Sequence, residues 1–164
     1  MRRVPAEATR PLRLAVLRPG QAAETALYGG DEAVGSAHFA AYDAAYDGDE
    51  DGDEDGDEAG DEAGDEAVGV ASLYAETRRG GPAPGWRLRA MATAPSHRGR
   101  GIGRAVLDAC LHHAAGQGGA EVWCNARLVA VGFYRAAGFE VVSDEFDIPG
   151  IGPHHVMRLL LDRP

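Results

Sequence analysis

The segment from Arg98 to Arg104 reads Arg-Gly-Arg-Gly-Ile-Gly-Arg, so that three glycines and three arginines fall within seven residues. It lies between a strand-like run, Trp86 to Thr93, and a helix-like run, Ala105 to Ala115. A glycine-rich turn that opens a helix presents backbone N–H groups without partners and the positive end of the helix dipole, and both favour an anion. Glycine also allows close approach of the main chain because it has no Cβ. The segment therefore predicts a site for a phosphorylated cofactor.

Hydrophobic periodicity predicts the elements that position this turn. The second half of the chain reads as a strand, a helix, a strand, a helix and two final strands, over Trp86 to Thr93, Ile102 to Ala115, Glu121 to Asn125, Ala126 to Ala137, Phe139 to Val142 and Val156 to Leu161. The first three of these form a βαβ unit, so their two strands are expected to be parallel neighbours.

The first half of the chain predicts a helix and a hairpin. Leu12 to Leu17 reads as a helix that ends at Arg18-Pro19-Gly20, and Gln21 to Gly35 reads as an irregular connection. Ser36 to Tyr42 and Val68 to Tyr74 read as strands. We expect these strands to pair antiparallel, with the acidic segment between them inserted in the hairpin.

That acidic segment, residues 47 to 66, consists of five copies of a four-residue unit, DGDE three times and AGDE twice. From Asp43 to Glu66 the chain holds 14 of its 26 acidic residues and no basic ones, so this stretch sets the net charge of −10 and leaves the rest mildly basic. We expect a solvated low-complexity loop, because such a segment repels itself and has little to bury. Its spacing matches a calcium-loop pattern at Asp47, Asp49, Asp51, Gly52 and Glu58, as any four-residue repeat of this composition would. We expect no specific metal site, since flanking amphipathic helices are missing.

Length and composition indicate one globular domain of 164 residues, 45% apolar. No run approaches the roughly 20 apolar residues that span a bilayer. The first twenty positions include five arginines and no apolar block, so we expect a cytoplasmic protein without a membrane partner. Cys110 and Cys124 stand in apolar contexts and are expected to be buried, reduced thiols. Basic residues interleaved with aromatic ones are missing, which argues against nucleic acid as a partner.

Four motifs in this order resemble the GNAT family of N-acetyltransferases: Met91-Ala92-Thr93-Ala94-Pro95, Arg98-Gly99-Arg100-Gly101-Ile102-Gly103, Trp123-Cys124-Asn125-Ala126-Arg127 and Gly132-Phe133-Tyr134-Arg135-Ala136-Ala137-Gly138-Phe139. The segment from Glu145 to His154 is also similar to the ElaA-type branch of that family. The resemblance implies a single domain over residues 1 to 164, of the α/β (α+β) class. It implies a central mixed, twisted sheet with flanking helices, and a splayed pair of parallel strands at the cofactor site.

The same resemblance implies acetyl-CoA as cofactor and a primary amine of a small molecule or a protein as acceptor, in a monomer or homodimer. Amides from Gly99 to Arg104 would bind the pyrophosphate, and amides around Met91 to Thr93 would polarise the thioester carbonyl, as in an oxyanion hole. The implied cofactor-binding set is Met91, Ala92, Thr93, Arg98, Gly99, Arg100, Gly101, Ile102, Gly103, Arg104, Asn125 and Phe133.

Catalysis then requires a proton donor for the thiolate and a base for the amine, since an amine like that of lysine has a pKa near 10.4. The resemblance places Tyr134 beside the sulfur as general acid. Many family members carry a glutamate on the cofactor strand, but Trp86 to Thr93 contains no carboxylate. His154 is the first candidate base, followed by His155, His38 and Glu76, and a water relay stays open.

Two alternatives remain. The missing carboxylate is compatible with a non-catalytic acyl-CoA-binding sensor of the same fold. A Rossmann-type dinucleotide enzyme ranks lower, because the turn reads G-x-G-x-G and lies past the middle of the chain.

Overall fold

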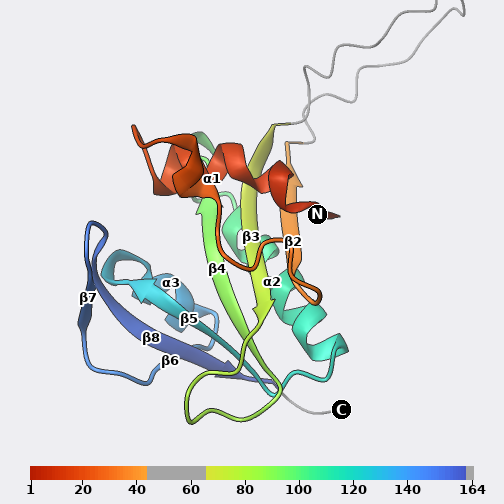
Figure 1. Cartoon of the computed structure of the whole chain (residues 1–164), viewed down its shortest axis with the longest axis vertical. Helices are drawn as coiled ribbons and strands as arrows, with labels where there is room; N and C mark the ends of the chain where they lie inside the picture. The colour runs from red at the N-terminus through yellow and green to blue at the C-terminus, as the bar shows by residue number, and fades with distance from the viewer. Residues whose placement is uncertain (44–65, 162–164) are drawn as a thin grey trace, which may run out of the picture.

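A twisted mixed sheet forms the centre of the molecule (Figure 1). The computed structural model describes residues 1–43 and 66–161. Within them the strands are β1 (Arg2–Val4), β2 (Ala37–Tyr42), β3 (Ala67–Ala75), β4 (Gly85–Thr93), β5 (Glu121–Arg127), β6 (Glu140–Val141), β7 (Phe146–Ile148) and β8 (Gly152–Leu160). Their order in the sheet is β1-β2-β3-β4-β5-β8-β6, and β7 pairs with β8. The described strand pairs are antiparallel except β4 and β5, which are parallel.

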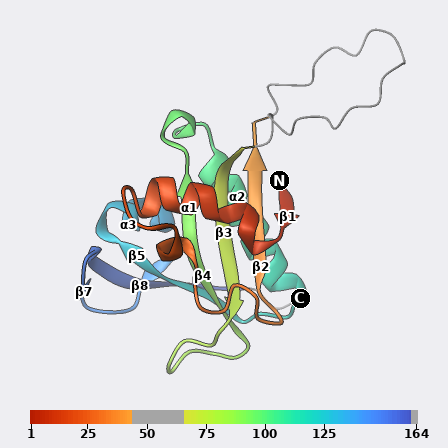
Figure 2. The ribbon, with the colours of Figure 1, turned by 45° about the horizontal axis from the view of Figure 1, so that its top comes forward.

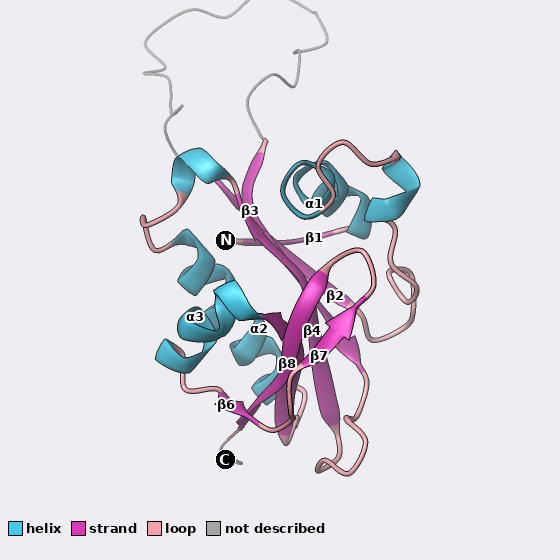
Figure 3. Ribbon diagram, turned by 90° about the vertical axis from the view of Figure 1, so that its left-hand side faces the viewer, coloured by secondary structure: helices cyan, strands magenta, loops and turns pink. Residues whose placement is uncertain are grey.

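Helices cover the sheet on both faces (Figures 2 and 3). The α-helices are α1 (Arg10–Leu17), α2 (Ile102–Gly116) and α3 (Val131–Ala136), and short 3-10 helices occupy Ala6–Thr9, Ala23–Ala26, Pro95–His97 and Leu128–Ala130. On one face Val106 and Leu107 of α2 pack with Leu88 in the larger hydrophobic core. On the other face Leu12 of α1 packs with Val70 and Ala92 in a smaller core. The sheet is therefore the middle layer of three.

The parallel strands β4 and β5 separate soon after they meet. Their ladder joins Gly85 to Glu121, Trp86 to Val122 and Arg87 to Trp123, and goes no further. Beyond that point β5 follows β8, with which it pairs along its whole length. On its other edge β4 has a register irregularity opposite β3, where Ala90 takes a positive φ of 55°. The expected splayed pair is thus confirmed, and the edge of β4 beyond Arg87 has no partner on β5.

Most expected elements are present, with one helix shorter than predicted. The hairpin of β2 and β3 is confirmed, while residues 44–65 of the acidic segment, including the positions of the calcium-loop pattern, lie outside the described residues. The expected helix from Ala126 to Ala137 is wrong over its first third. Ala126 and Arg127 pair with β8 instead, because satisfying backbone groups in the sheet outweighs local helix propensity, even that of alanine.

Three short stretches of strand or helix were not predicted from the sequence. Strands β1 and β7 are three residues long, too short for a periodic signal, and β8 begins at Gly152 rather than Val156 because its first residues pair with β7. The stretch from Gln21 to Gly35 contains one 3-10 turn.

Cys110 and Cys124 are buried and free, as predicted. Over residues 1–43 and 66–161, no helix has the length and apolar character needed to cross a membrane.

Candidate active site

The glycine turn leads directly into α2. Gly99 and Gly101 have φ values of +74° and +80°, which residues other than glycine rarely adopt, and a Cβ at either residue would meet no atom of the described residues within 4 Å. Gly101 is the N-cap of α2 and no side chain caps the helix. The first amides of α2 therefore lack intrahelical acceptors, and they lie next to the open space beside Gly101. Arg98, Arg100 and Arg104 are exposed around them, so the turn has the geometry of an anion site.

Gly103 joins this turn to the end of β4. A Cβ at Gly103 would lie 3.2 Å from Thr93 Oγ1, and 3.7 Å from both Met91 Cε and Phe133 Cε2. Met91, Thr93 and Phe133 therefore surround the first turn of α2, as the predicted cofactor-binding set requires. The side chain of Ala92 is buried in the smaller core on the opposite face, so only its backbone is available to a ligand.

Two of the three turn arginines have acidic neighbours. The Nε of Arg104 donates to Asp108 Oδ1 at 2.8 Å, one helical turn along α2. The guanidinium of Arg100 lies 3.9 Å from Asp43 Oδ2, which also accepts from His97 Nε2 at 2.7 Å. All of these groups are at least partly exposed, so such pairs exchange readily for a phosphate.

A cavity of about 190 Å³ lies between the diverging ends of β4 and β5. Its walls come from both strands, from the end of α1, from Tyr28 and from the β7–β8 turn. Met91, Asn125, Tyr134 and His154 line it together, although their positions span more than sixty residues of the chain. Four of the predicted site residues therefore share one cavity, and one of them, Met91, also lies against Gly103 of the turn.

Tyr134 lies on the cavity wall with little exposure. Its ring packs between those of Phe133 and Phe139, at centroid distances of 5.2 and 5.4 Å, and its hydroxyl points toward Met91 Sδ at 3.6 Å. Burial raises the pKa of Tyr134 well above its usual value, and the nearby Cys124 thiol adds to this effect. Tyr134 therefore keeps its proton at neutral pH, as a general acid must.

His154 faces the same cavity and is 4% exposed. Its Nδ1 donates to the carbonyl oxygen of Gly152 at 2.7 Å, and its ring stacks on Phe146. Because a carbonyl oxygen only accepts, the neutral ring carries its proton on Nδ1 and leaves Nε2 as an acceptor. This is the tautomer that a base needs.

The other candidate bases lie elsewhere. His155 donates from Nδ1 to the carbonyl oxygen of Ser143 at 3.2 Å, His38 is buried under α1, and Glu76 binds Arg87 at 3.1 Å. None of the three lines the described cavity. The structure thus brings together Tyr134 and His154, and does not bring His155, His38 or Glu76 to them.

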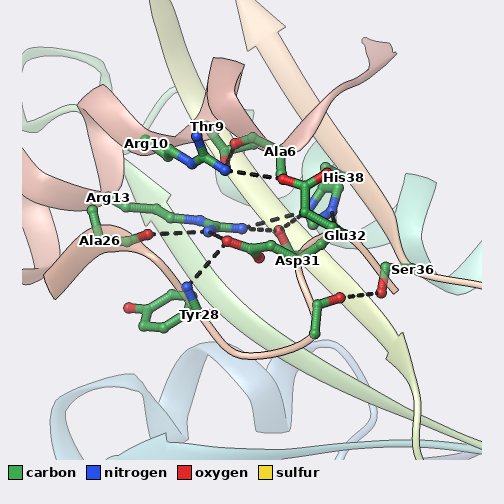
Figure 4. Close-up of polar contacts among 12 residues, drawn as sticks. Ala6, Thr9, Arg10, Arg13, Ala26, Tyr28, Asp31, Glu32, Ser36 and His38 are labelled. Carbon is green, nitrogen blue, oxygen red and sulfur yellow. Dashed lines mark hydrogen bonds and ion pairs between the residues drawn. The ribbon is translucent and has the colours of Figure 1, made fainter. Parts of the chain in front are cut away.

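A buried ionic cluster under α1 was missed by sequence reasoning (Figure 4). The fully buried Arg13 donates to Asp31 Oδ2 at 2.8 Å, to Ser72 Oγ at 2.6 Å and to the carbonyl oxygen of Ala26 at 3.2 Å. Asp31 Oδ2 also accepts from the amide of Tyr28 at 3.1 Å. The cluster thereby ties the irregular segment after α1 to the sheet and holds Tyr28 at the cavity. The only signal was an arginine amid apolar residues of the α1 sequence.

Charge within this cluster is stabilised by hydrogen bonds. Burial alone would raise the pKa of Asp31, but hydrogen bonds from Arg13, Tyr74 and the Tyr28 amide lower it below the ordinary value of 3.8. The hydroxyl of Tyr74 donates to Asp31 Oδ1. Burial together with this hydrogen bond raises the pKa of Tyr74 to about 12. Asp31 is therefore ionised and Tyr74 protonated throughout the neutral range.

Comparison with known proteins agrees with this geometry. The family model described as an acetyltransferase (GNAT) domain matches residues 33–161. The protein named as the uncharacterized N-acetyltransferase YitI of Bacillus subtilis (strain 168) is 32% identical over 155 residues, covering 92% of this chain and 89% of that protein. This chain belongs to the GNAT family of acetyltransferases. It is accordingly an acyltransferase, and enzymes of this family use acetyl-CoA as the acetyl donor.

Solved structures share the GNAT fold. The structure of Escherichia coli ElaA matches with a TM-score of 0.68 at 18% identity, over 93% of this chain and 87% of that one. An aminoglycoside 6'-N-acetyltransferase complexed with coenzyme A matches with a TM-score of 0.66 at 15% identity, over 97% and 92% of the two chains. At these identities the likeness concerns the fold, so the acceptor must be argued from this chain's own residues.

Proposed function

We propose that this GNAT protein transfers the acetyl group of acetyl-CoA to a primary amine of a small molecule or a protein. One observation carries the proposal. The cavity between the splayed ends of β4 and β5 brings Met91, Asn125, Tyr134 and His154 together beside an uncapped, glycine-rich helix start. This arrangement supports an anion site at the helix start and two proton-transfer groups at the cavity beside it.

The residues of the turn fit the cofactor. Open space beside Gly99 and Gly101 leaves room for a diphosphate at the amides of the turn, with Arg98 and Arg100 available to its charges. The half-buried Asn125 stands on β5 where an amide side chain would bind the pantetheine arm. The free edge of β4 near Ala90 and Met91 offers backbone donors for a carbonyl oxygen.

Two side chains would move protons. Bound acetyl-CoA supplies the activated thioester. His154 Nε2 would accept the proton that the attacking amine loses, directly or through water, because Nδ1 is already committed to Gly152. The Tyr134 hydroxyl would give its proton to the departing sulfur, and it is held for this role by the aromatic packing around it.

Two measurements on the intact protein test the proposal. Calorimetry at low salt measures coenzyme A binding, and thiol release from acetyl-CoA is followed across amines, amino acids and peptides. We expect binding together with amine-dependent thiol release, and mass spectrometry should show an acetylated amine. Binding with thiol release at background across the whole panel would contradict acetyl transfer and favour a sensor. Absence of binding would contradict the placement of the cofactor.

A further inference from the structure

Among the described residues, the charged side chains that line the cavity between β4 and β5 are positive. Its described lining includes four arginines, Arg18, Arg87, Arg89 and Arg127, as well as His154, and no aspartate or glutamate. These arginines come from the end of α1, from β4 and from β5. A simple alkylamine is a cation at neutral pH, so such a wall repels it.

The arginines of the two strands are not those of the cofactor turn. In the β3–β4 ladder Arg89 stands opposite Ser72, which contacts Arg13 on the face covered by α1. The turn and α2 lie on the other face, where Leu88 joins the core with Val106 and Leu107. The diphosphate site has Arg98, Arg100 and Arg104 at hand. Arg89 therefore lines the cavity from the sheet face opposite the turn.

Three of the cavity arginines lack an anionic partner among the residues that the structure describes. Glu76 neutralises Arg87 at 3.1 Å, whereas Arg18, Arg89 and Arg127 pair with no carboxylate within residues 1–43 and 66–161. Arg89 instead lies over the rings of Tyr28 and Tyr74, at 4.8 and 5.6 Å from their centroids. Stacking uses the face of a guanidinium and leaves its N–H edge free to bind a carboxylate or phosphate.

The guanidinium groups of Arg18 and Arg127 lie beside the same backbone carbonyl oxygen. Arg18 donates to the carbonyl oxygen of Leu17 at 2.9 Å, and Arg127 donates to the same oxygen at 3.4 Å. Two like charges beside one carbonyl repel each other, and an anion between them relieves that repulsion. Aromatic support for Arg89 and the convergence of Arg18 and Arg127 are independent signs of an anion subsite.

We propose that the acceptor of this enzyme is a small amine that also bears an anionic group, a carboxylate or a phosphate, and that Arg18, Arg89 and Arg127 bind this group. The inference rests on the proposed acetyl transfer and names its substrate class. The cavity of about 190 Å³ also receives the acetyl end of the cofactor under the proposed function, so the space left beside the arginines suits only a small acceptor. The surrounding positive charge also lowers the pKa of a bound amine, which favours its deprotonation where no carboxylate base is present.

Binding of product analogues tests the subsite without relying on turnover. The protein is first saturated with coenzyme A, and product analogues are then titrated into it by calorimetry. The analogues are N-acetyl-alanine, N-acetyl-leucine, N-acetyl-phenylalanine and N-acetyl-glutamate. Each is compared with its α-carboxamide, which lacks the charge of the α-carboxylate. N-acetyl-O-phosphoethanolamine against N-acetyl-ethanolamine gives the phosphate arm. We expect the charged member of at least one pair to bind about 10- to 100-fold more tightly. The pair with the largest ratio of dissociation constants shows whether the subsite prefers a carboxylate or a phosphate.

Variants assign the effect to the arginines. Arg89→Gln and Arg127→Gln should each reduce the preference for the charged analogue about tenfold. Arg79→Gln, which makes the same charge change at an exposed arginine outside the cavity lining, should leave it unchanged. Because Arg89 packs on two tyrosines, Arg127→Gln keeps the test valid if the first variant folds poorly.

The outcomes separate the two proposals. Equal binding of charged and uncharged analogues, no binding of any charged analogue, or an undiminished preference in both variants would overturn the anion subsite. Efficient acetylation of amines without an anionic group, in preference to amines that carry a carboxylate or a phosphate, would also overturn it, while leaving acetyl transfer intact. Selective binding of the charged analogues with thiol release at background would support the subsite and contradict acetyl transfer.

Discussion

Replacement of Gly101 by alanine tests the cofactor turn most directly. Gly101 has a φ of +80°, and a Cβ there would meet no protein atom within 4 Å. The cost to the folded protein is therefore backbone strain alone, about 1–2 kcal/mol for a non-glycine residue in the left-handed region. The free energy of unfolding should fall by this amount, and the fold should persist.

Coenzyme A binding should suffer an additional loss. The new methyl group occupies the open space beside the amides that we assign to the diphosphate. If it displaces one hydrogen bond to a charged phosphate oxygen, the loss is about 1.5–3 kcal/mol. That corresponds to a Kd raised about 10- to 100-fold.

Gly118→Ala is the matched control. Gly118 has a φ of +70° and open space around it, and it lies at the far end of α2. The two variants should lose similar stability in urea unfolding, while calorimetry with coenzyme A should show weaker binding only for Gly101→Ala. If Gly101→Ala and Gly118→Ala bind coenzyme A as tightly as the parent protein, the diphosphate does not lie at this turn.

Three further predictions concern the proton-transfer groups and the buried cluster. Tyr134→Phe should lower kcat about 100-fold with an unchanged Kd for coenzyme A; a kcat that is retained would show that Tyr134 only packs. His154→Gln should lower kcat while the circular dichroism spectrum and coenzyme A binding stay the same, and full activity would shift the role of base to water. Asp31→Asn should cost about 3 kcal/mol of stability at pH 7 in urea unfolding, because it leaves Arg13 buried without its counter-ion. The pKa of Asp31 is lowered on folding, so its contribution is complete above the ordinary value of 3.8 and is lost as pH falls through the lowered value; the difference between parent and variant should shrink there.

The glycine turn and the helix after it could be predicted because their signals are local. Glycines at 99 and 101 appear where the chain takes a left-handed turn, and the apolar period of α2 follows at once. The helix after β5 was predicted too early, since the alanine-rich sequence carries no sign that Ala126 and Arg127 pair with β8. Strand pairing depends on a segment thirty residues away, which a local pattern does not report.

The amino-acid sequence by itself carried the local features: a glycine-rich turn that opens a helix, the ordered motifs of the GNAT family, and a strand before that turn without a carboxylate. Only the tertiary structure placed His154, and none of the other candidate bases, at the described cavity, buried Arg13 against Asp31, and gathered Arg18, Arg89 and Arg127 around that cavity. The physical reason is the distance along the chain over which each interaction acts. Backbone conformation and helix capping depend on neighbouring residues, whereas burial and the convergence of charges depend on which distant segments the sheet brings together.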